Sequence, residues 1–457
     1  MTVVVVVGGG VAGLAAARRL ESLAPMTHVV LVEKDDALGG KIRTEHVDGF
    51  VVEAAPDSFL TRKERGVGLC EELGLGDELI ARRPEHRGSF VRRGNELHPL
   101  PEGLTGMIPT SLEALETSQL LSAAGKARFA AERDVAPRFA DDDESVAAFV
   151  SRRFGREAYD ALVEPLMTGI YGGDGDQLSL GATFPQLRAI ECEHGSVLRG
   201  LSAPPVADRA PFVSLRAGMG SLVDALRDDL SRTQLRTGRG ATRVVRRAGG
   251  FDVELEGDET IPTNGVVLAT PAFATADLIA ELDPQLAEEH EDIPYASSVV
   301  VTLGFSRADV VPLDGYGYVV PRAEGGDVLA CTWSSQKWEH RAPEEAVLLR
   351  VYMGRFGARD VTIDPDVELV AAALAEVEFL GASATPLLSR VHRWPLGMPQ
   401  YVIGHPDRLG RIEAALVAHP GLAVAGAAYR GVGIPDCIAS GEAAAESVAS
   451  SLAGAGV

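Results

Sequence analysis

The chain opens with two apolar runs that are separated by a segment of helix-forming residues. Five valines occupy positions 3–7, and a second apolar run covers residues 29–32. Runs of β-branched apolar residues that are bounded by glycine are typical of buried parallel strands. Between the two runs, the residues from Leu14 to Leu20 favour a helix with one apolar face. The pattern therefore predicts a strand, a helix and a second strand that form one βαβ unit.

Later parts of the chain follow different patterns. Residues 112–154 are mostly helical in character, whereas residues 299–353 contain short β-rich segments between Gly, Pro and charged turns, which predicts an antiparallel sheet. Short buried strands are predicted at 265–269 and 422–425, and a helix is predicted over 439–452. We therefore expect the chain to leave a nucleotide-binding lobe, to build a second lobe, and to return to the first at its C-terminus.

Length and charge narrow the functional classes. The chain has 457 residues, which exceeds the roughly 250–300 at which a single core stops growing, so two or three lobes are expected. Its net charge of −22 argues against nucleic acid and anionic membrane as partners. No apolar stretch reaches the roughly 18 residues of a spanning helix, and the four cysteines form no metal-binding pair. We therefore expect a cytoplasmic protein with no transmembrane segment and no metal site.

A glycine motif lies between the first strand and the first helix. Gly8, Gly9, Gly10, Val11, Ala12 and Gly13 form a GxGxxG sequence. In such a motif the glycines permit a tight turn, close approach of the backbone to a pyrophosphate, and close packing of the helix. Glu33 ends the second strand, where an acid can accept hydrogen bonds from a ribose hydroxyl. The motif predicts dinucleotide binding; the alternative is a purely structural glycine turn.

A second glycine pair follows shortly after Glu33. The sequence Leu38-Gly39-Gly40-Lys41 resembles the extended fingerprint of FAD-dependent oxidoreductases of the amine oxidase type. NAD-binding units usually lack this pair, so the resemblance indicates FAD. The alternative is an ordinary turn after the second strand.

Several further blocks resemble the flavin-dependent porphyrinogen oxidases, in order and over essentially the whole chain. The most specific are EAAPDSFLTRK at 53–63, EPLMTGIYGGD at 164–174 and GVGIPDCI at 431–438. More narrowly, the chain resembles the coproporphyrinogen III oxidase branch of Gram-positive bacteria. In mitochondrial-type relatives an arginine precedes the residue corresponding to Phe90, whereas this chain has Ser89, which favours the coproporphyrinogen branch.

The resemblance implies an α/β fold with a discontinuous Rossmann-like FAD-binding lobe of the amine oxidase type, an antiparallel-sheet substrate lobe and a helical insertion. Residues 1–62, 212–278 and 400–457 would form the FAD-binding domain. Residues 100–200 would form the helical domain. Residues 63–99 and 279–399 would form the substrate-binding domain.

The resemblance also implies which residues line the FAD. They are Gly8, Gly9, Gly10, Val11, Ala12, Gly13, Glu33, Lys34, Gly40, Lys41, Ala55, Pro56, Asp57 and Ser58, with Val244 on the adenine side and Trp394, Ile434, Pro435 and Asp436 around the isoalloxazine. Ala55 stands where the family usually has glycine. A positive φ there would strain an alanine, so the φ angle of Ala55 decides whether the segment keeps its family conformation.

Substrate residues follow from the same resemblance. Thr168, Gly169, Ile170 and Tyr171 belong to the expected active-site loop, for which a plain helix-to-strand turn is the alternative. Lys63 would meet a propionate or be a solvated charge. Residues 81–94 contain five arginines and one acid, so this segment has a local positive charge. The segment is either a surface that faces an anion or an ordinary hairpin with exposed arginines. The arginines are Arg82, Arg83, Arg87, Arg92 and Arg93. No catalytic base is assigned, since no His/carboxylate pair or Ser/His/Asp set is evident.

The activity implied by the resemblance is the oxygen-requiring, six-electron oxidation of coproporphyrinogen III to coproporphyrin III in heme biosynthesis. Three flavin cycles would each release hydrogen peroxide, with hydride transfer from a meso carbon to flavin N5. The partners would be the porphyrinogen, molecular oxygen and, in transient contact, a ferrochelatase. The alternatives are a protoporphyrinogen IX oxidase, an amine oxidase or carotenoid desaturase, and a non-catalytic flavin-fold binding protein.

Overall fold

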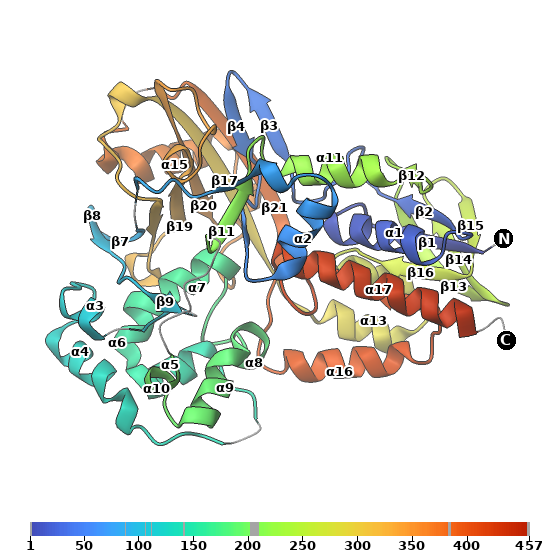
Figure 1. Cartoon of the computed structure of the whole chain (residues 1–457), viewed down its shortest axis with the longest axis horizontal. Helices are drawn as coiled ribbons and strands as arrows, with labels where there is room; N and C mark the ends of the chain where they lie inside the picture. Colours follow the sequence, from blue (N-terminus) through green and yellow to red (C-terminus); the bar gives the residue numbers. More distant parts are fainter. Residues whose placement is uncertain are drawn as a thin grey trace.

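The computed structural model describes residues 2–86, 88–105, 107–110, 112–139, 142–201, 210–382 and 385–454. These residues build a parallel sheet with covering helices, a larger and mostly antiparallel sheet, and a group of helices beside both (Figure 1). Both ends of the chain lie at the outer end of the parallel-sheet lobe (Figure 1).

The parallel sheet has five strands that come from distant parts of the sequence. Their order is β12 (Gln234–Arg236), β2 (His28–Val32), β1 (Val3–Val7), β16 (Gly265–Leu268) and β22 (Leu422–Val424). All neighbouring strands run parallel, with Val5 in register between Val30 and Val266. Both faces of β1 are buried, which explains why its sequence is continuously apolar rather than alternating.

Helices cover both faces of this sheet. On one face lie α1 (Val11–Leu23), α11 (Gly220–Asp229) and α17 (Ile434–Gly454), and α1 and α17 lie side by side (Figure 1). The other face is covered by α12 (Ala272–Ile279), α13 (Pro284–Glu291), α16 (His405–Leu416) and a small sheet of β13 (Ala241–Arg247), β14 (Gly250–Leu255) and β15 (Glu259–Thr263).

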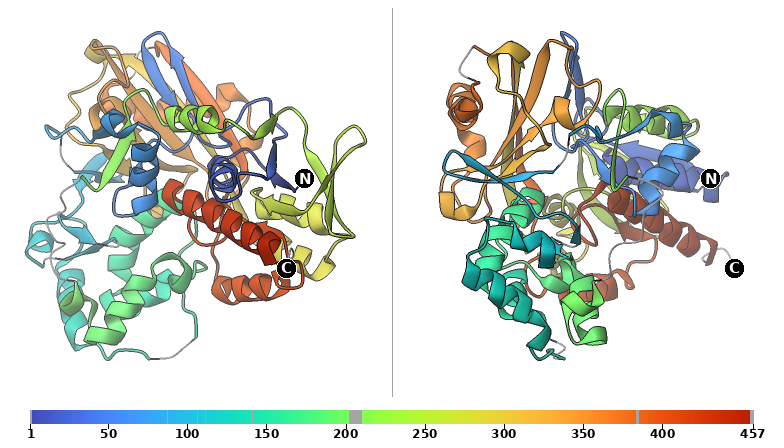
Figure 2. Two further views of the ribbon diagram at one scale, coloured as in Figure 1. Left: turned by 45° about the vertical axis from the view of Figure 1, so that its right-hand side comes forward. Right: turned by 60° about the vertical axis from the view of Figure 1, so that its left-hand side comes forward.

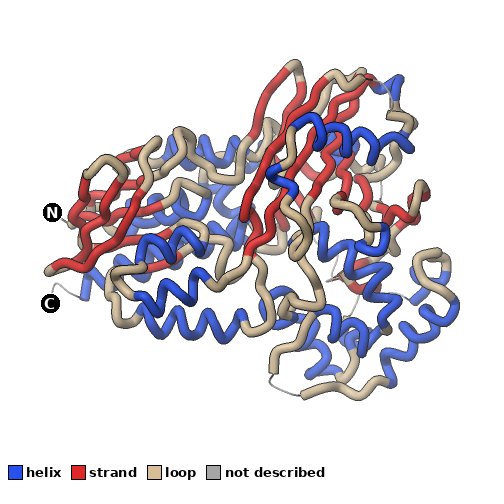
Figure 3. Tube along the Cα trace, turned by 180° about the vertical axis from the view of Figure 1, so that it is seen from behind, coloured by secondary structure: helices blue, strands red, loops and turns tan. Residues whose placement is uncertain are grey.

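The larger sheet has seven strands and is seen from behind in Figure 3. Their order is β21 (Leu388–Pro399), β17 (Tyr295–Ser306), β20 (Ala346–Met353), β19 (Val328–Trp333), β18 (Gly317–Val319), β7 (Phe90–Arg93) and β8 (Glu96–Pro99). Neighbouring strands are antiparallel except for β18 and β7. The apolar face of this sheet packs against α15 (Asp366–Val377).

Helices from the middle of the chain form their own core around Phe129, Phe149 and Leu162. They are α3 (Leu112–Glu116), α4 (Ala123–Ala130), α5 (Val146–Phe154), α6 (Arg156–Ala158), α7 (Glu164–Tyr171), α8 (Leu180–Thr183), α9 (Pro185–His194) and α10 (Val197–Gly200). Both views in Figure 2 show them grouped below the large sheet.

Short elements connect these parts. They are β3 (Thr44–Val47), β4 (Phe50–Glu53), β5 (Phe59–Leu60), α2 (Glu64–Glu72), β6 (Leu79–Ala81), β9 (Leu104–Thr105), β10 (Ile108–Pro109), β11 (Phe212–Leu215) and α14 (Ser334–Lys337). Of these, β4 leads into residues 54–58, which are hydrogen-bonded to β21 and β20 of the large sheet.

The predicted fold class is confirmed, including the βαβ start, the antiparallel sheet over 299–353 and the return of the chain to the first lobe. The exact limits of the three domains stay a prediction. The sheet β13–β14–β15 and the long strand β21 were not predicted, and α17 begins at Ile434 rather than near residue 439. Among the helices that the structure describes, none combines the length and apolar character needed to cross a membrane.

Candidate functional site

The glycine motif forms the tight turn that its sequence predicts. Gly8 has φ +107°, and its N–H donates to the carbonyl of Val32 at 2.8 Å. A Cβ atom on Gly13 would lie 1.9 Å from the Gly8 carbonyl oxygen, so α1 packs directly on the turn. A Cβ atom on Gly10, by contrast, would meet no atom within 4 Å. Open space therefore lies next to the first turn of α1, whose N-terminus has no side-chain cap.

The second glycine pair lies against the first. The N–H of Gly39 donates to the carbonyl of Gly9 at 2.8 Å, and a Cβ atom on Gly40 would lie 3.3 Å from the Cα of Gly10. Glu33 holds this arrangement from the strand end, because its carboxylate accepts from the N–H of Gly9 at 2.6 Å. The structure thus brings the two predicted glycine segments and Glu33 together.

Three further residues that were predicted to line the cofactor differ in their exposure. Lys41 is half-buried, and burial lowers the pKa of its ammonium. No carboxylate of the described chain pairs with Lys41, so this cation beside the glycine turn is free to meet an anion. Lys34 follows β2 and is exposed. Val244 is buried in β13, which is an edge strand of the small sheet, so one side of its backbone does not pair with another strand of that sheet.

Residues 54–58 are held from the large sheet. The Trp394 indole of β21 donates to the carbonyl of Ala54 at 3.0 Å, and the Arg350 guanidinium of β20 donates to the carbonyl of Ala55. Five non-glycine residues of the described chain have positive φ, and Ala55 is not one of them. The segment therefore accommodates alanine in place of glycine without backbone strain.

Asp57 is the anchor of this segment. Its carboxylate lies 3.1 Å from the Lys337 ammonium, accepts from the Trp338 indole at 3.1 Å and from the Ser58 hydroxyl at 2.7 Å. Burial alone would raise the pKa of Asp57, but the Lys337 and Arg350 cations hold it well below its usual range. The side chain of Asp57 is therefore committed to partners within the protein, which fix the backbone of the segment.

The substitution Asp57→Asn should lower the free energy of unfolding by about 2 kcal/mol at pH 7, because hydrogen bonds to charged groups contribute about 1.5–3 kcal/mol. A depressed folded-state pKa means that this contribution is present above about pH 4 and is lost as the pH falls further. Urea unfolding at pH 7 and pH 3 should therefore give a smaller difference between variant and wild type at pH 3. Asp309→Asn, at an exposed position, is the control, and a pH-independent effect of Asp57→Asn would contradict the ion-pair assignment.

The C-terminal block joins the site through α17. A Cβ atom on Gly441 would lie 2.0 Å from the carbonyl oxygen of Ala12, so α17 contacts the start of α1 closely. At the N-terminal end of α17, with Ile434 and Pro435 buried, the Asp436 carboxylate accepts from the Lys63 ammonium at 2.5 and 2.6 Å. Lys63 and Asp436, predicted for different roles, are thus an ion pair.

The segment predicted as an active-site loop is the end of a helix. Thr168 to Tyr171 form the last turn of α7, and Gly172, with φ +59°, follows as its C-cap. Thr168 is fully buried and donates to Glu164 at 2.8 Å, whereas Gly169 and Ile170 are exposed. This segment is therefore the end of a helix, and it exposes one small residue, Gly169, and one apolar residue, Ile170.

Tyr171 connects this helix end to the C-terminal block. Its carbonyl accepts from the Gln400 amide at 2.8 Å, and its ring lies 6.4 Å from that of Tyr401. The hydroxyl of Tyr401 in turn accepts from the N–H of Gly431 at 2.8 Å. Burial raises the pKa of Tyr171 to about 12, with a smaller contribution from the Asp436 carboxylate. Tyr171 is therefore a neutral hydrogen-bonding group near the Lys63–Asp436 pair.

The arginines of residues 81–94 do not form one surface, which corrects that expectation. Arg82 stacks on Tyr316, Arg83 pairs with Glu85, Arg92 pairs with Glu376, and Arg93 donates to the carbonyl of Leu120. Arg87 lies outside the described residues. Arg82 and Arg83 follow β6, whereas Arg92 and Arg93 belong to β7, and these two strands lie in different sheets.

Some residues that organise the site were not predicted. Arg350, Lys337 and Trp338 hold residues 54–58 from nearly 300 positions away. The sequence pattern that could have indicated Arg350 is a single arginine within the otherwise apolar strand VLLRVYM. Within the described ranges, no group of three or more His, Cys, Asp or Glu side chains could hold a metal ion.

The geometry suits a long, flat cofactor with a phosphate group. The open N-terminus of α1 and the cation of Lys41 can bind a pyrophosphate, and Glu33 can accept from a ribose. The end of α7 is connected to this region by residues 54–58, by Trp394 and by the start of α17. The residues present therefore fit a dinucleotide that would extend from the first turn of α1 toward residues 54–58 and the start of α17.

Comparisons with known proteins agree with this arrangement. Residues 11–449 match the family described as flavin containing amine oxidoreductase. The coproporphyrinogen III oxidase of Bacillus subtilis is 34% identical, over 96% of both chains, and that of Propionibacterium freudenreichii is 35% identical, over 97% of this chain and 90% of the relative. A crystal structure from Exiguobacterium sp. 255-15, assigned as a protoporphyrinogen oxidase, has a TM-score of 0.88 and 33% identity over 98% of both chains.

Proposed function

Because this chain belongs to the flavin-containing amine oxidoreductase family, and within it to the flavin-dependent porphyrinogen oxidases, we propose that it oxidises coproporphyrinogen III to coproporphyrin III. Membership of the family makes the chain a flavin-dependent oxidoreductase. The further proposal is that FAD is the flavin, that molecular oxygen reoxidises it with release of hydrogen peroxide, and that the step belongs to heme biosynthesis. The observation that supports it is that segments far apart in sequence contact one another: Trp394 donates to the carbonyl of Ala54, and Lys63 pairs with Asp436.

We assign the cofactor contacts residue by residue. Gly8 to Gly13 and Lys41 would bind the pyrophosphate, Glu33 the ribose, and the edge strand at Val244 the adenine. Residues 55–58, Trp394 and the turn at 434–436 would surround the ring system. Bound FAD supplies the electron-accepting chemistry, two electrons at a time. The protein would orient the substrate and exclude water, and the contacts of Asp57 with Lys337 and Trp338 hold residues 54–58 in place.

The substrate is proposed to lie against the end of α7. The exposed residues Gly169 and Ile170 offer a small, apolar surface to a flat macrocycle, and Tyr171 stays neutral beside it. Lys63 would meet one propionate. Its pairing with Asp436 means that it is already positioned, and that the pair as a whole carries no net charge. Apolar contact must therefore supply much of the affinity for a substrate with four carboxylates.

Neutralising Lys63 should weaken substrate binding more than the chemical step. We expect Lys63→Met to raise KM for coproporphyrinogen about 3- to 10-fold with kcat within about twofold, because a half-exposed cation contributes roughly 1 kcal/mol. Steady-state rates of porphyrin formation measure both constants. Lys126→Met, on α4 of the helical lobe, is the matched control and should change neither. An unchanged KM would remove Lys63 from the substrate site.

The oxygen requirement is tested by stoichiometry. Without oxygen, coproporphyrinogen should bleach the visible absorption of the bound flavin. In air, each coproporphyrin formed should consume three molecules of oxygen and yield three of hydrogen peroxide, since six electrons leave in pairs. A flavin that stays oxidised with coproporphyrinogen would contradict the proposal. A cytoplasmic location and transient contact with a ferrochelatase stay predictions.

A further inference from the structure

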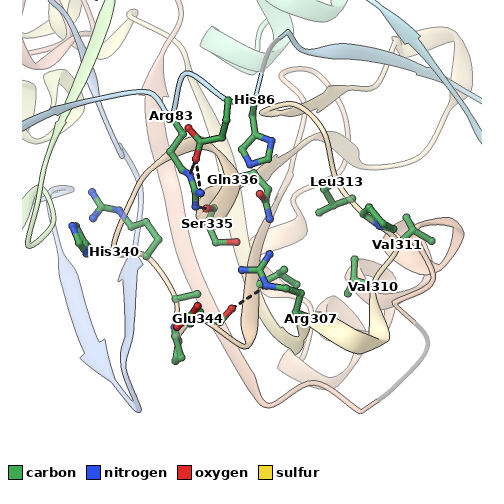
Figure 4. A pocket seen from close by; sticks show the side chains of 16 residues that line it. Arg83, His86, Arg307, Val310, Val311, Leu313, Ser335, Gln336, His340 and Glu344 are labelled. Atoms are coloured by element: carbon green, nitrogen blue, oxygen red, sulfur yellow. Dashed lines mark hydrogen bonds and ion pairs between the residues drawn. The ribbon is translucent and has the colours of Figure 1, made fainter.

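A cavity lies beside α14 and is lined in part by Ser335 and Gln336 of this helix (Figure 4). Its volume is about 620 Å³, which falls within the range of small-molecule sites. The lining comes from residues 83–86, 307–313 and 335–347. None of the residues assigned above to the flavin or the porphyrinogen lines it, so a ligand in this cavity would be a different molecule.

The polar part of the cavity centres on Gln336 and Arg307. Gln336 is only 4% exposed, and its amide has no hydrogen-bond partner among the described residues. Figure 4 shows this amide directed into the cavity, toward the guanidinium of Arg307. The polar atoms of this amide are accessible from the cavity rather than sealed from solvent, so the amide can donate to, or accept from, a group bound there.

Arg307 is a cation without an anionic partner. It donates to the backbone carbonyls of Glu344 at 2.9 Å and Ala346 at 3.1 Å, which fixes its position. No carboxylate within the described part of the chain forms an ion pair with it. Arg83 at the other side of the cavity is, by contrast, paired with Glu85. Arg307 is therefore an exposed cation of the cavity without a carboxylate partner, beside the amide of Gln336. The lining also contains the guanidinium of Arg341 and the carboxylate of Glu344.

The remaining wall is apolar. Val310, Val311 and Leu313 line it on the side away from Arg83 (Figure 4). Val310 and Leu313 belong to the core of the large sheet, so this wall is firm. A ligand that fills the cavity thus needs both an anionic end and an apolar body.

We propose that this cavity binds a small amphipathic carboxylate. The carboxylate would accept from the Arg307 guanidinium, whose planar fork matches it, and from the Gln336 amide, while the hydrocarbon part would lie against Val310, Val311 and Leu313. In a chain of net charge −22, a local cation without a carboxylate partner is the place where an organic anion can be held.

Octanoate is the probe that tests this, titrated calorimetrically into the flavin-loaded protein. We expect saturable binding to one site with Kd of about 1 mM or tighter, the strength that a ligand of this size permits. Gln336→Met and Arg307→Met should each weaken binding at least about fivefold. Arg156→Met, at an exposed arginine of the helical lobe, is the matched control and should leave it unchanged. Octan-1-ol, which has the same apolar body without the charge, should bind at least about tenfold more weakly.

Three results would overturn the proposal: no saturable binding of octanoate, equal binding of octanol, or unchanged binding in Gln336→Met. Because Gln336 makes no hydrogen bond in the described structure, Gln336→Met should fold normally, and its thermal unfolding checks this. Excess coproporphyrin should not displace octanoate, since the two sites share no residue. The outcome is independent of the porphyrinogen oxidase assignment, because calorimetry needs no turnover.

Discussion

Replacement of Gly10 by glutamate is expected to abolish flavin binding while leaving the protein folded. Gly10 has φ −70° and ψ 175°, which any residue can adopt, and a Cβ atom there meets nothing within 4 Å. A larger side chain therefore enters space that the fold leaves open. If that space holds a pyrophosphate, the new carboxylate both fills it and repels the phosphate charge.

The expected loss for Gly10→Glu is at least about 100-fold in flavin affinity, since like charges in contact cost several kcal/mol. The measurement is the ratio of flavin to protein by visible absorption after incubation with excess FAD and desalting. Gly410→Glu, at an exposed glycine of α16 whose Cβ position is equally open, is the matched control and should keep its flavin. Full flavin content in Gly10→Glu would show that the first turn of α1 does not hold the phosphate.

The second large effect is expected at a buried ion pair of the helical lobe. Glu132 and Arg153 are both fully buried and form a salt bridge, and Glu132 also accepts from the Ser196 hydroxyl and the N–H groups of Val197 and Leu198. The pair joins the 3₁₀ turn Ala131–Asp134 to α5 and α10. Neutralising Glu132 would leave the charge of Arg153 buried without its main counter-charge.

Glu132→Gln should therefore lower the free energy of unfolding by about 3–5 kcal/mol. Urea unfolding, followed by circular dichroism, measures the change. Asp160→Asn is the matched control, because it breaks an exposed pair with Arg156 and should cost no more than about 1 kcal/mol. Equal losses in the two variants would contradict the view that burial makes the Glu132–Arg153 pair structurally important.

Much of the fold followed from local sequence signals. The five valines, the glycine turn and the strand at 29–32 predict the start of the parallel sheet because each signal depends on neighbouring residues. The strand β21 was missed because its sequence, LSRVHRWPLGMP, is polar and contains two prolines, and its place at the sheet edge tolerates both. The C-terminal helix was predicted to begin too late, since Pro435 suggests a break but is compatible with the first turn of a helix.

The site was predictable only in part, because sequence signals depend on neighbouring residues whereas the site joins distant ones. The cofactor segments have motifs of their own, but the residues that hold them come from elsewhere in the chain. Asp57 is predicted as a cofactor residue, which stays a prediction, but the partners of its carboxylate, Lys337 and Trp338, lie about 280 positions away. Likewise, a positive run of sequence at 81–94 does not become a positive surface, because its arginines extend to different partners.

The substrate preference is the central claim that remains to be measured. The Exiguobacterium structure is assigned as a protoporphyrinogen oxidase, so protoporphyrinogen IX is the competing substrate. The most direct measurement compares initial rates of porphyrin fluorescence in air for the two porphyrinogens, using flavin-loaded protein with Gly10→Glu as the flavin-free control. The account predicts faster oxidation of coproporphyrinogen III, and no oxidation above the spontaneous rate in the control. A clear preference for protoporphyrinogen, or no flavin-dependent oxidation of either substrate, would contradict it.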